Sequence, residues 1–524
     1  MSLVRIAKNP VIAKLVDSDP DIVVFVNNLL SYDVNVGGAF GWSGKSSFFT
    51  MYNRTFPAGF VYLVTEELSK AGHDVRIIQS ALPKPKGPEN PIVDSFGNDD
   101  PRYDYQLKAL RQIEKYGAGI VRVATGGGKS KIAKLVMKRF PGVTLFLSTR
   151  AILLRQMDKQ LKDIGMKTGM IGDGEMHFVS GVNLGMVQTL VQALEEPNLN
   201  NEILAVIASE HKKNKKVLTR QQAEKTARLV YERKIKRRDA ISKFLSMVNV
   251  VIGEEAHEAG GNSYYKILQH CRNAKIRVAL TATPFMRSDM EDNMQLMAGF
   301  GPILIDISEK MLIDRGILAK PFFKFVDSQA HPKLFKTSSY ERALKYGYTE
   351  NEFLINDMVR DAKHAKLHGL PVLTLVTRKK FGEILQKAYE KAGIRAVFLK
   401  GDDDSAERSE KLSALASGKI DGIIGTTILD VGVDVPAIGL VQLAGGGKAE
   451  VALRQRIGRG LRAKKSGPNV AFIADYSCNK NKYLSVHAEQ RLSIIKNTPG
   501  FAEGILPKGK DFDWNIFEKS LVDA

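Results

Sequence analysis

The chain has 524 residues, of which 44% are hydrophobic, and its formal net charge is +20. Its length predicts about three domains, and so strong a positive charge suggests a polyanionic partner. Only two cysteines occur, Cys271 and Cys478, so a disulfide scaffold is not indicated and a reducing compartment is expected. The sequence contains neither a run of about 18 apolar residues nor a signal-peptide pattern, so we expect a cytoplasmic protein without a membrane span.

The N-terminal region, residues 1–98, differs from the rest because its charges balance, with nine basic and nine acidic residues. Its pattern predicts a strand over 21–30 ("DIVVFVNNLL"), a helix over 57–72 ("PAGFVYLVTEELSKAG") and a strand over 73–79 ("HDVRIIQ"). The segment 82–91 ("LPKPKGPENP") combines proline, glycine and charge, which is typical of a linker. We therefore expect a small α/β accessory domain over residues 1–98.

After the linker, short apolar runs alternate with helical patterns, which indicates βαβ units and parallel sheets. The runs form two series that separate near 316–325 ("GILAKPFFKF"). The first series is "AGIVRVAT", "VTLFLST", "VNVVIG" and "IRVALTAT", and the second is "LPVLTLVT", "IRAVFLK", "DGIIGTT", "IGLVQLAG" and "NVAFIAD". We expect two α/β domains, over 99–305 and 320–480, and a C-terminal tail over 481–524.

A strongly basic segment interrupts the first of these domains at about 194–246. Its centre, Ser209 to Lys243, holds thirteen basic and four acidic residues, a net charge of +9, and no glycine or proline. The residue types favour helix. The segment is either a solvated pair of charged helices or an insertion that faces nucleic acid, and we favour the second because lysine and arginine bind phosphates.

The segment 123–130 ("VATGGGKS") stands between an apolar run and a helical pattern. A glycine loop in that position points backbone N–H groups at phosphates, and here Thr125, Gly126, Gly127 and Gly128 would form it. Lys129 would reach the β- and γ-phosphates, and the Ser130 hydroxyl would hold Mg²⁺. Two similar stretches, "GWSGKSS" (41–47) and "AGGGKAE" (444–450), lack the strand and helix on either side, and we interpret both as loops.

The stretch "VIGEEAH" (251–257) places two carboxylates and a histidine after a buried apolar run. A phosphate loop needs such a second strand to hold Mg²⁺ and the attacking water. Glu254 would help to hold Mg²⁺ where ATP-hydrolysing enzymes usually have Asp, and Glu255 would orient and deprotonate the water. Mg²⁺ keeps several of its waters, so a carboxylate one methylene longer can still serve it. We expect a working site, with His257 part of it.

Six further motifs accompany these two in a fixed order. They are "RYDYQ" (102–106), "LSTRAILLRQ" (147–156), "GMVQTL" (185–190), "TAT" (281–283), "TTILDVGVDVP" (426–436) and "QRIGRGLR" (455–462). Together with the phosphate loop and "GEEAH", this order resembles that of the superfamily 2 helicases of the DExH type. The resemblance implies an α/β chain of two tandem RecA-like domains, preceded by the small N-terminal domain, that hydrolyses ATP with Mg²⁺.

The resemblance also assigns roles to single residues. Arg102 and Gln106 would bind the base of ATP, and Gly432 and Asp434 its ribose. Gln455 would contact the γ-phosphate or the water. Arg459 and Arg462, three residues apart on one helical face, would stabilise the charge on the transferred phosphoryl group. The nucleic-acid contacts would be Ser148, Thr149, Arg150, Gln188, Thr189, Arg378, Thr426 and Thr427, which suit phosphates rather than bases.

Within the superfamily, the N-terminal stretch "FPAGFVYLVTEELSKAGHDVRI" before the first motif looks like that of the UvsW-type phage helicases. That resemblance implies a DNA translocase that regresses forks, migrates junctions and unwinds or reanneals DNA in recombination, repair and replication. Its partners would be branched, forked, single- or double-stranded DNA, with a single-stranded-DNA-binding protein as a candidate; if phage-encoded, it would act in the bacterial cytoplasm. Two alternatives stay open: an RNA helicase, and an ATP-gated DNA-binding switch with little turnover.

Overall fold

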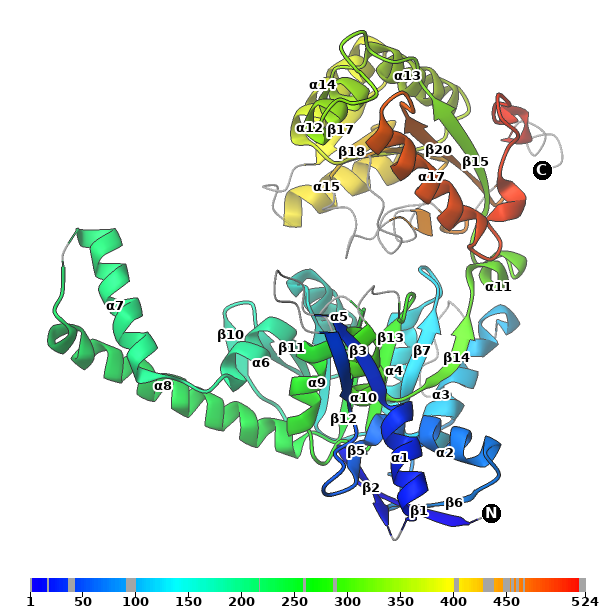
Figure 1. The fold of residues 1–524 in the computed structure, drawn as a ribbon. Coiled ribbons are helices and arrows are strands. Elements are labelled where there is room, and N and C mark those ends of the chain that lie inside the picture. The colour runs from blue at the N-terminus through cyan, green and yellow to red at the C-terminus, as the bar shows by residue number, and fades with distance from the viewer. Residues whose placement is uncertain are drawn as a thin grey trace. The chain divides into compact units, whose positions relative to one another are not determined.

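The computed structural model describes the whole chain except residues 1, 17, 36–42, 91–99, 216, 258–260, 286–289, 400–404, 427–437, 446–452, 454–456, 459–460, 465–466 and 518–524. The chain divides into two compact units. One consists of Met1–Arg122 and Lys129–Asp306, and the other of Val123–Gly128 and Ile307–Ala524. The helices and strands of both are labelled in Figure 1.

The N-terminal domain is a four-stranded sheet with two helices. Its elements are β1 (Leu3–Lys8), β2 (Ile12–Val16), α1 (Pro20–Leu29), β3 (Ser31–Asn35), β4 (Ser43–Ser47), β5 (Thr55–Pro57), α2 (Val61–Lys70) and β6 (Asp74–Ile78). The sheet order is β5-β2-β1-β6, in which β1 and β6 are parallel and the other pairs antiparallel, while β3 and β4 form a separate hairpin. This confirms the expected small α/β region.

The strand predicted over 21–30 is wrong, because these residues form helix α1. Proline at the first position of the helix, Pro20, fits the fixed φ of a helix start. Ile22, Val23 and Val26 are buried together on one helical face, in the same core as Phe60 of the neighbouring turn. Tertiary packing therefore overrides the preference of β-branched residues for strands.

The N-terminal domain packs directly on helix α10 (Met290–Phe300) of the first helicase domain. Ala298 belongs to the N-terminal hydrophobic core, although it lies more than 200 residues along the chain from that domain. A Cβ atom at Gly59 would lie 2.0 Å from the carbonyl oxygen of Met297. Only glycine allows so close an approach of the two backbones.

The first helicase domain contains an eight-stranded sheet in the order β10-β9-β11-β8-β12-β13-β7-β14. The strands are β7 (Ala118–Val123), β8 (Thr144–Ser148), β9 (Thr168–Gly172), β10 (Glu175–His177), β11 (Val182–Met186), β12 (Val250–Glu254), β13 (Ile276–Thr281) and β14 (Ile303–Ile307). The helices are α3 (Asp104–Tyr116), α4 (Lys129–Arg139), α5 (Ala151–Asp163), α6 (Val187–Leu194), α9 (Gly261–His270) and α10. From β9 to β7 all neighbouring strands are parallel, as the continuous apolar runs predict.

The basic segment forms two helices, α7 (Leu199–Asn214) and α8 (Arg220–Met247), which we call the arm (Figure 1). Thr219 and Gln222 form a capping box at the start of α8. The outer half of α8 packs on α7 through a small core of Ile203, Ala223 and Ala227. Its inner end is buried in the core of the first helicase domain, where the ring of Phe244 stacks on that of Phe178 at 4.6 Å.

Only two residues separate α8 from β12, and both are held in place. Val248 is fully buried. The backbone N–H of Asn249 donates to the carbonyl of Val143 at 2.8 Å, and the Asn249 side chain accepts from the N–H of Val143 at 3.2 Å. The arm is therefore joined without a flexible linker to the strand that ends in Glu254.

The second helicase domain is built on a six-stranded, all-parallel sheet in the order β15-β20-β19-β16-β18-β17. The strands are β15 (Lys320–Asp327), β16 (Val372–Val376), β17 (Ala396–Leu399), β18 (Gly422–Gly425), β19 (Leu440–Ala444) and β20 (Val470–Ser477). Its helices include α11 (Glu309–Asp314), α12 (Tyr340–Leu344), α13 (Glu352–Leu367), α14 (Lys379–Lys391), α15 (Ser405–Ala416) and α17 (Lys482–Lys496). The expected two tandem parallel-sheet domains are confirmed.

The segment after β20 packs into the second domain instead of extending from it. The ring of Phe512 stacks on that of Phe472 at 4.4 Å, and Trp514 meets the same Phe472 ring edge-on at 5.0 Å. Both side chains belong to the hydrophobic core of the domain. Residues up to about 517 are thus structural parts of this domain.

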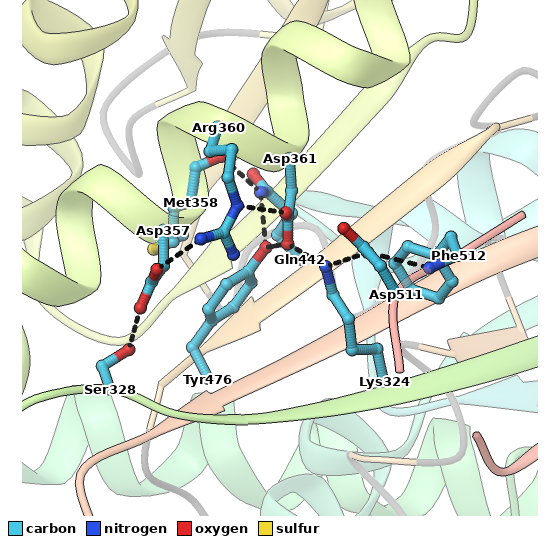
Figure 2. Close-up of polar contacts among 10 residues, drawn as sticks. All are labelled: Lys324, Ser328, Asp357, Met358, Arg360, Asp361, Gln442, Tyr476, Asp511 and Phe512. Atoms are coloured by element: carbon cyan, nitrogen blue, oxygen red, sulfur yellow. Dashed lines mark hydrogen bonds and ion pairs between the residues drawn. The ribbon is translucent and has the colours of Figure 1, made fainter. Parts of the chain in front are cut away.

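A network of polar side chains, which we call the buried network, crosses the second domain (Figure 2). The carboxylate of Asp361, which is fully buried, accepts a hydrogen bond from the hydroxyl of Tyr476 at 2.6 Å and pairs with the Lys324 ammonium at 2.8 Å. Lys324 lies between Asp361 and Asp511, to which it is 2.6 Å away. Gln442 donates to the Tyr476 oxygen at 3.0 Å. The network joins β15, α13, β19, β20 and the C-terminal segment.

Candidate ATP and nucleic-acid site

The loops that the motifs assign to ATP and nucleic acid follow neighbouring strands of the first sheet. The paired residues at this edge are Thr281 with Arg122, Glu254 with Leu280, Gly253 with Leu147, and Met186 with Ser148. The carboxyl ends of β7, β13, β12, β8 and β11 therefore lie in one row. Ligands of parallel α/β sheets bind outside this edge of the sheet.

The phosphate loop joins the end of β7 to the start of α4 at Lys129. Gly126 and Gly128 have φ values of +88° and +82°, which residues with a Cβ rarely adopt. A Cβ at Gly127 would lie 2.5 Å from the Val123 side chain. The local backbone and packing thus favour glycine at each of the three positions. The loop leads into a helix N-terminus, which attracts phosphate.

Lys129 and Glu255 form an ion pair in the first unit, with 3.1 Å between the ammonium nitrogen and carboxylate oxygen Oε1. The two side chains are only 10% and 14% exposed, so the pair is largely shielded from water. Lys129 is the residue that would meet the phosphates of ATP, and Glu255 the one that would act on the attacking water. In this state each neutralises the other, and the phosphates of ATP would compete with Glu255 for Lys129.

The backbone at Glu255 has a φ of +44°, in the left-handed region, which is uncommon for a residue with a long side chain. Such strained residues gather at functional sites. His257 contacts the same carboxylate, with 3.5 Å between Nδ1 and Oε2, and its Nδ1 lies 2.7 Å from the Thr281 hydroxyl. The Thr281 hydroxyl also accepts from the N–H of Thr283 at 3.1 Å. Strand β13 therefore orients the histidine of "GEEAH".

Glu254 ends β12 and is 8% exposed. The hydroxyl of Tyr264, on α9, donates to the Glu254 backbone carbonyl at 2.9 Å and so holds the end of the strand in place. Ser130, in the first turn of α4, is partly buried. One hydroxyl and one or two carboxylates are what proteins usually offer to Mg²⁺, which takes its other ligands from phosphates and water. This set of donors fits Mg²⁺, with Ser130 and Glu254 as the residues that would hold it.

The residues expected at the base of ATP lie at the start of α3. Gln106 is buried in the first turn of that helix. Arg102 is exposed in the short 3-10 turn before it, where its guanidinium pairs with Asp100 at 2.6 Å. The pairing lowers the pKa of the Asp100 carboxyl, through the side-chain and backbone hydrogen bonds that Arg102 donates.

The nucleic-acid residues expected in the first domain lie at the ends of two adjacent strands. Ser148 ends β8 and is fully buried, with its hydroxyl accepting from the N–H of Arg150 at 3.3 Å. Thr149 and Arg150 follow it at the start of α5 and are partly exposed. Gln188 is exposed and Thr189 partly exposed, both in the first turn of α6 after β11. The structure thus brings these two motifs side by side, next to the strand of Glu254.

In the second domain, the described site residues also follow strand ends. Arg378 precedes α14 just after β16, and Thr426 follows β18, the neighbour of β16 in the sheet. Arg462 is exposed and forms a β-bridge with Leu318. Five expected residues lie outside the described part of the chain: Thr427, Gly432, Asp434, Gln455 and Arg459.

Two residues of the site were not assigned roles from the sequence. Thr281 belongs to the "TAT" motif, but its contact with His257 depends on the register of β12 and β13. Tyr264 has no local signal, because its role is a hydrogen bond to the backbone of a residue ten positions earlier.

Comparison with protein families gives two matches. The model of the type III restriction enzyme res subunit matches residues 100–286, and that of the helicase conserved C-terminal domain matches residues 354–464. The matched regions include the phosphate loop, "GEEAH" and the whole of the last motif. The chain is a superfamily 2 helicase, an enzyme that binds and hydrolyses ATP and acts on nucleic acid.

Curated relatives support this class. A protein of Sulfolobus islandicus filamentous virus, named as helicase 22, is 24% identical over 75% of this chain and 67% of its own length. The UvrABC system protein B of Thermotoga petrophila is 29% identical over 32% of this chain and 26% of its own. The chain thus spans about two thirds of the first relative and about a quarter of the second.

Solved structures give a likeness of fold. The helicase MrfA, in a structure described as bound to DNA, covers 80% of this chain and 53% of its own at 13% identity, with a TM-score of 0.51. T4 UvsW covers 96% of this chain and 99% of its own at 16% identity, with a TM-score of 0.40, which is too low to support an argument. Among the described residues, no helix is long and apolar enough to cross a membrane.

Proposed function

We propose that this helicase is an ATP-dependent DNA translocase that remodels branched DNA by regressing forks, migrating junctions, and unwinding or reannealing strands. Recombination, repair and replication are the processes that need this activity. A single-stranded-DNA-binding protein is a candidate partner, because remodelling exposes single strands, and the bacterial cytoplasm is the proposed location.

One observation supports a motor most directly. Glu255, which would act on the water, follows β12, and Ser148, Thr149 and Arg150 follow the adjacent strand β8. Neighbouring strands lie about 4.8 Å apart, so the two loops are close enough for a change at the ATP site to act on the nucleic-acid loop. The choice of DNA rests on the resemblance of the N-terminal domain to that of the UvsW-type helicases.

The test is steady-state ATPase activity with branched, duplex and single-stranded DNA and with RNA. We expect the branched DNA to stimulate hydrolysis most. Stronger stimulation by RNA than by any DNA would instead make the chain an RNA helicase. Equal stimulation by all DNA forms would remove branched DNA as the preferred substrate and leave a general DNA translocase.

Variants of the site test the assignment of residues. Lys129→Ala should abolish hydrolysis, because it removes the charge that meets the phosphates. Lys45→Ala is the matched control, since Lys45 also stands in a Gly-Lys-Ser sequence but is exposed on the β3–β4 hairpin. We expect Lys45→Ala to keep DNA-free ATPase activity. The opposite result would mean that the wrong loop was chosen.

The two carboxylates should respond differently. Glu255→Gln should retain ATP binding and hold the protein on DNA without turnover, because it keeps the shape of the side chain but cannot take a proton. Glu254→Asp should keep or raise activity, and Glu254→Ala should lose it through poor placement of Mg²⁺. Full hydrolysis by Glu255→Gln would contradict the role proposed for this residue.

The unusual Glu254 also favours a second candidate, an ATP-gated DNA-binding switch. A wild-type protein that shows no DNA-stimulated turnover, and gains it with Glu254→Asp, would support the switch over the motor.

A further inference from the structure

The arm exposes a row of basic side chains on the face of α8 that points away from α7. Lys225, Lys236 and Lys243 are separated by 11 and 7 residues, so they lie on one face of a helix with 3.6 residues per turn. All three are exposed, and none has an ion pair within the described part of the chain. We call this row the lysine stripe.

Three other basic residues of α8 are in ion pairs, which distinguishes them from the lysines of the stripe. Lys234 and Arg238 pair with Glu202 and Glu196, both outside α8, and Arg228 pairs with Glu224 at 2.7 Å. The ion pairs that the structure describes in α8 thus involve basic residues off the stripe. What is left on the stripe is positive charge facing solvent.

The sequence around the stripe retains repulsion that a purely structural helix would avoid. Between Arg233 and Arg238, "RKIKRR" places five basic residues in six positions. Arg233 and Arg237 are exposed and four residues apart, an arrangement of like charges that costs about 0.2–0.5 kcal/mol in a helix. These two residues lie beside the stripe around the helix, so a polyanion that binds along the stripe would offset the repulsion.

The geometry favours a duplex over a single strand. From Lys225 to Lys243 the helix rises about 27 Å, at about 1.5 Å per residue, which corresponds to about eight base pairs of DNA at about 3.4 Å each. Surfaces for single strands use exposed aromatic rings on which bases stack. The arm has two aromatic residues in α8, Tyr231, which is partly buried, and Phe244, which is buried against Phe178.

We propose that the lysine stripe binds the phosphate backbone of double-stranded DNA, as a contact additional to the motif loops. The proposal rests on the proposed DNA-translocase function and names a second binding surface for the same substrate. Because α8 is anchored in the core of the first helicase domain, the stripe would hold the duplex at a fixed place relative to the motor.

The experiment compares two triple variants of the full chain that remove the same charge. Lys225→Gln, Lys236→Gln and Lys243→Gln neutralise the stripe. Lys70→Gln, Lys162→Gln and Arg228→Gln, the control, neutralise exposed residues that are already in ion pairs. Glutamine is a good helix former, so both variants should fold. Circular dichroism and DNA-free ATPase activity check this.

The measurement is the affinity for a blunt duplex and for a single strand over a range of salt concentrations. For the duplex, the slope of log K against log salt should become shallower by about 0.9 for each lost phosphate contact, up to about 2.7 for the stripe variant. The control variant should keep the wild-type slope. The single strand should be bound about equally by all three proteins.

Two results would overturn the proposal. Equal slopes for the stripe and control variants would mean that the arm is only a solvated pair of charged helices. An equal loss on single-stranded and duplex DNA would remove the duplex assignment. Failure of the proposed function would give a different result: DNA would not stimulate the ATPase activity of the wild-type protein.

Discussion

The lysine stripe and the buried network show two opposite uses of charge in one chain. Lys324 is 8% exposed and lies between two carboxylates, while Lys236 is exposed without an ion pair among the described residues. A buried charge must be paired, since desolvation costs several kcal/mol. An exposed charge costs little and stays available for a partner. Burial and pairing together therefore separate lysines that stabilise the fold from lysines that can bind a polyanion.

The largest expected effect comes from breaking the buried network at its centre. Asp361→Ala should lower the free energy of unfolding by about 3–5 kcal/mol, because it leaves the Lys324 ammonium and the Tyr476 hydroxyl without their shared buried partner. Chemical denaturation, followed by the fluorescence of Trp514 in the same domain, measures this. Asp511→Ala is the control, since that carboxylate is 51% exposed and its loss should cost about 1 kcal/mol or less.

A second buried pair, Arg491 with Asp475, should give the next largest effect. The guanidinium binds both carboxylate oxygens at 2.7 Å, and the two side chains are 5% and 4% exposed. Arg491→Met should cost about 3 kcal/mol, because it leaves the Asp475 carboxylate buried without its ionic partner. The double variant with Asp475→Leu should recover most of the loss. If the double variant were no more stable than Arg491→Met, the charge of Asp475 would not be the cause.

Lys464 is a partly buried lysine that donates to backbone carbonyls, and it has no acidic partner among the described residues. Burial lowers its pKa to about 8. Its ammonium donates to the carbonyls of Ile438 and Val470. Between pH 8 and about 10 the unfolded chain binds more protons at this residue, so the free energy of unfolding should rise by about 2 kcal/mol.

Denaturation at several pH values, compared with Lys464→Met, isolates this contribution. The variant should lose the rise between pH 8 and 10 while other titrating groups affect both proteins alike. A wild-type protein whose stability falls as steeply as that of the variant over this interval would show that Lys464 is solvated.

The smallest expected effect on stability comes from neutralising the lysine stripe. The triple glutamine variant should change the free energy of unfolding by no more than about 0.5 kcal/mol, as is usual for exposed sites. The same denaturation experiment measures it. A loss of more than 2 kcal/mol would mean that these lysines support the fold, and the contrast with the buried network would fail.

Much of the fold could be predicted from the sequence, because each strand of a parallel sheet is buried on both faces and appears as a continuous apolar run. "VNVVIG" and "IRVALTAT" are such runs, and both are central strands. The same rule failed at 21–30, where an equally apolar run forms an amphipathic helix. Periodicity in so short a segment does not separate a buried helix from a strand.

The positions of Lys129 and Glu255 along the chain could be predicted, since glycine loops and paired carboxylates are local patterns. The 3.1 Å contact between them depends on strand order, which no local pattern contains. The same holds for Lys324 and Asp511, which are 187 residues apart. The lysines of the stripe were visible as part of a basic segment, but only the structure separates them from Lys234 and Arg238, whose charges are paired.

The direct junction between α8 and β12 makes the arm a mechanical lever. Val248 and Asn249 leave no slack between the helix and the strand, and that strand ends in Glu254. No flexible segment lies between the arm and this strand, so a load on the base of the arm is also a load on the strand that carries the site carboxylate.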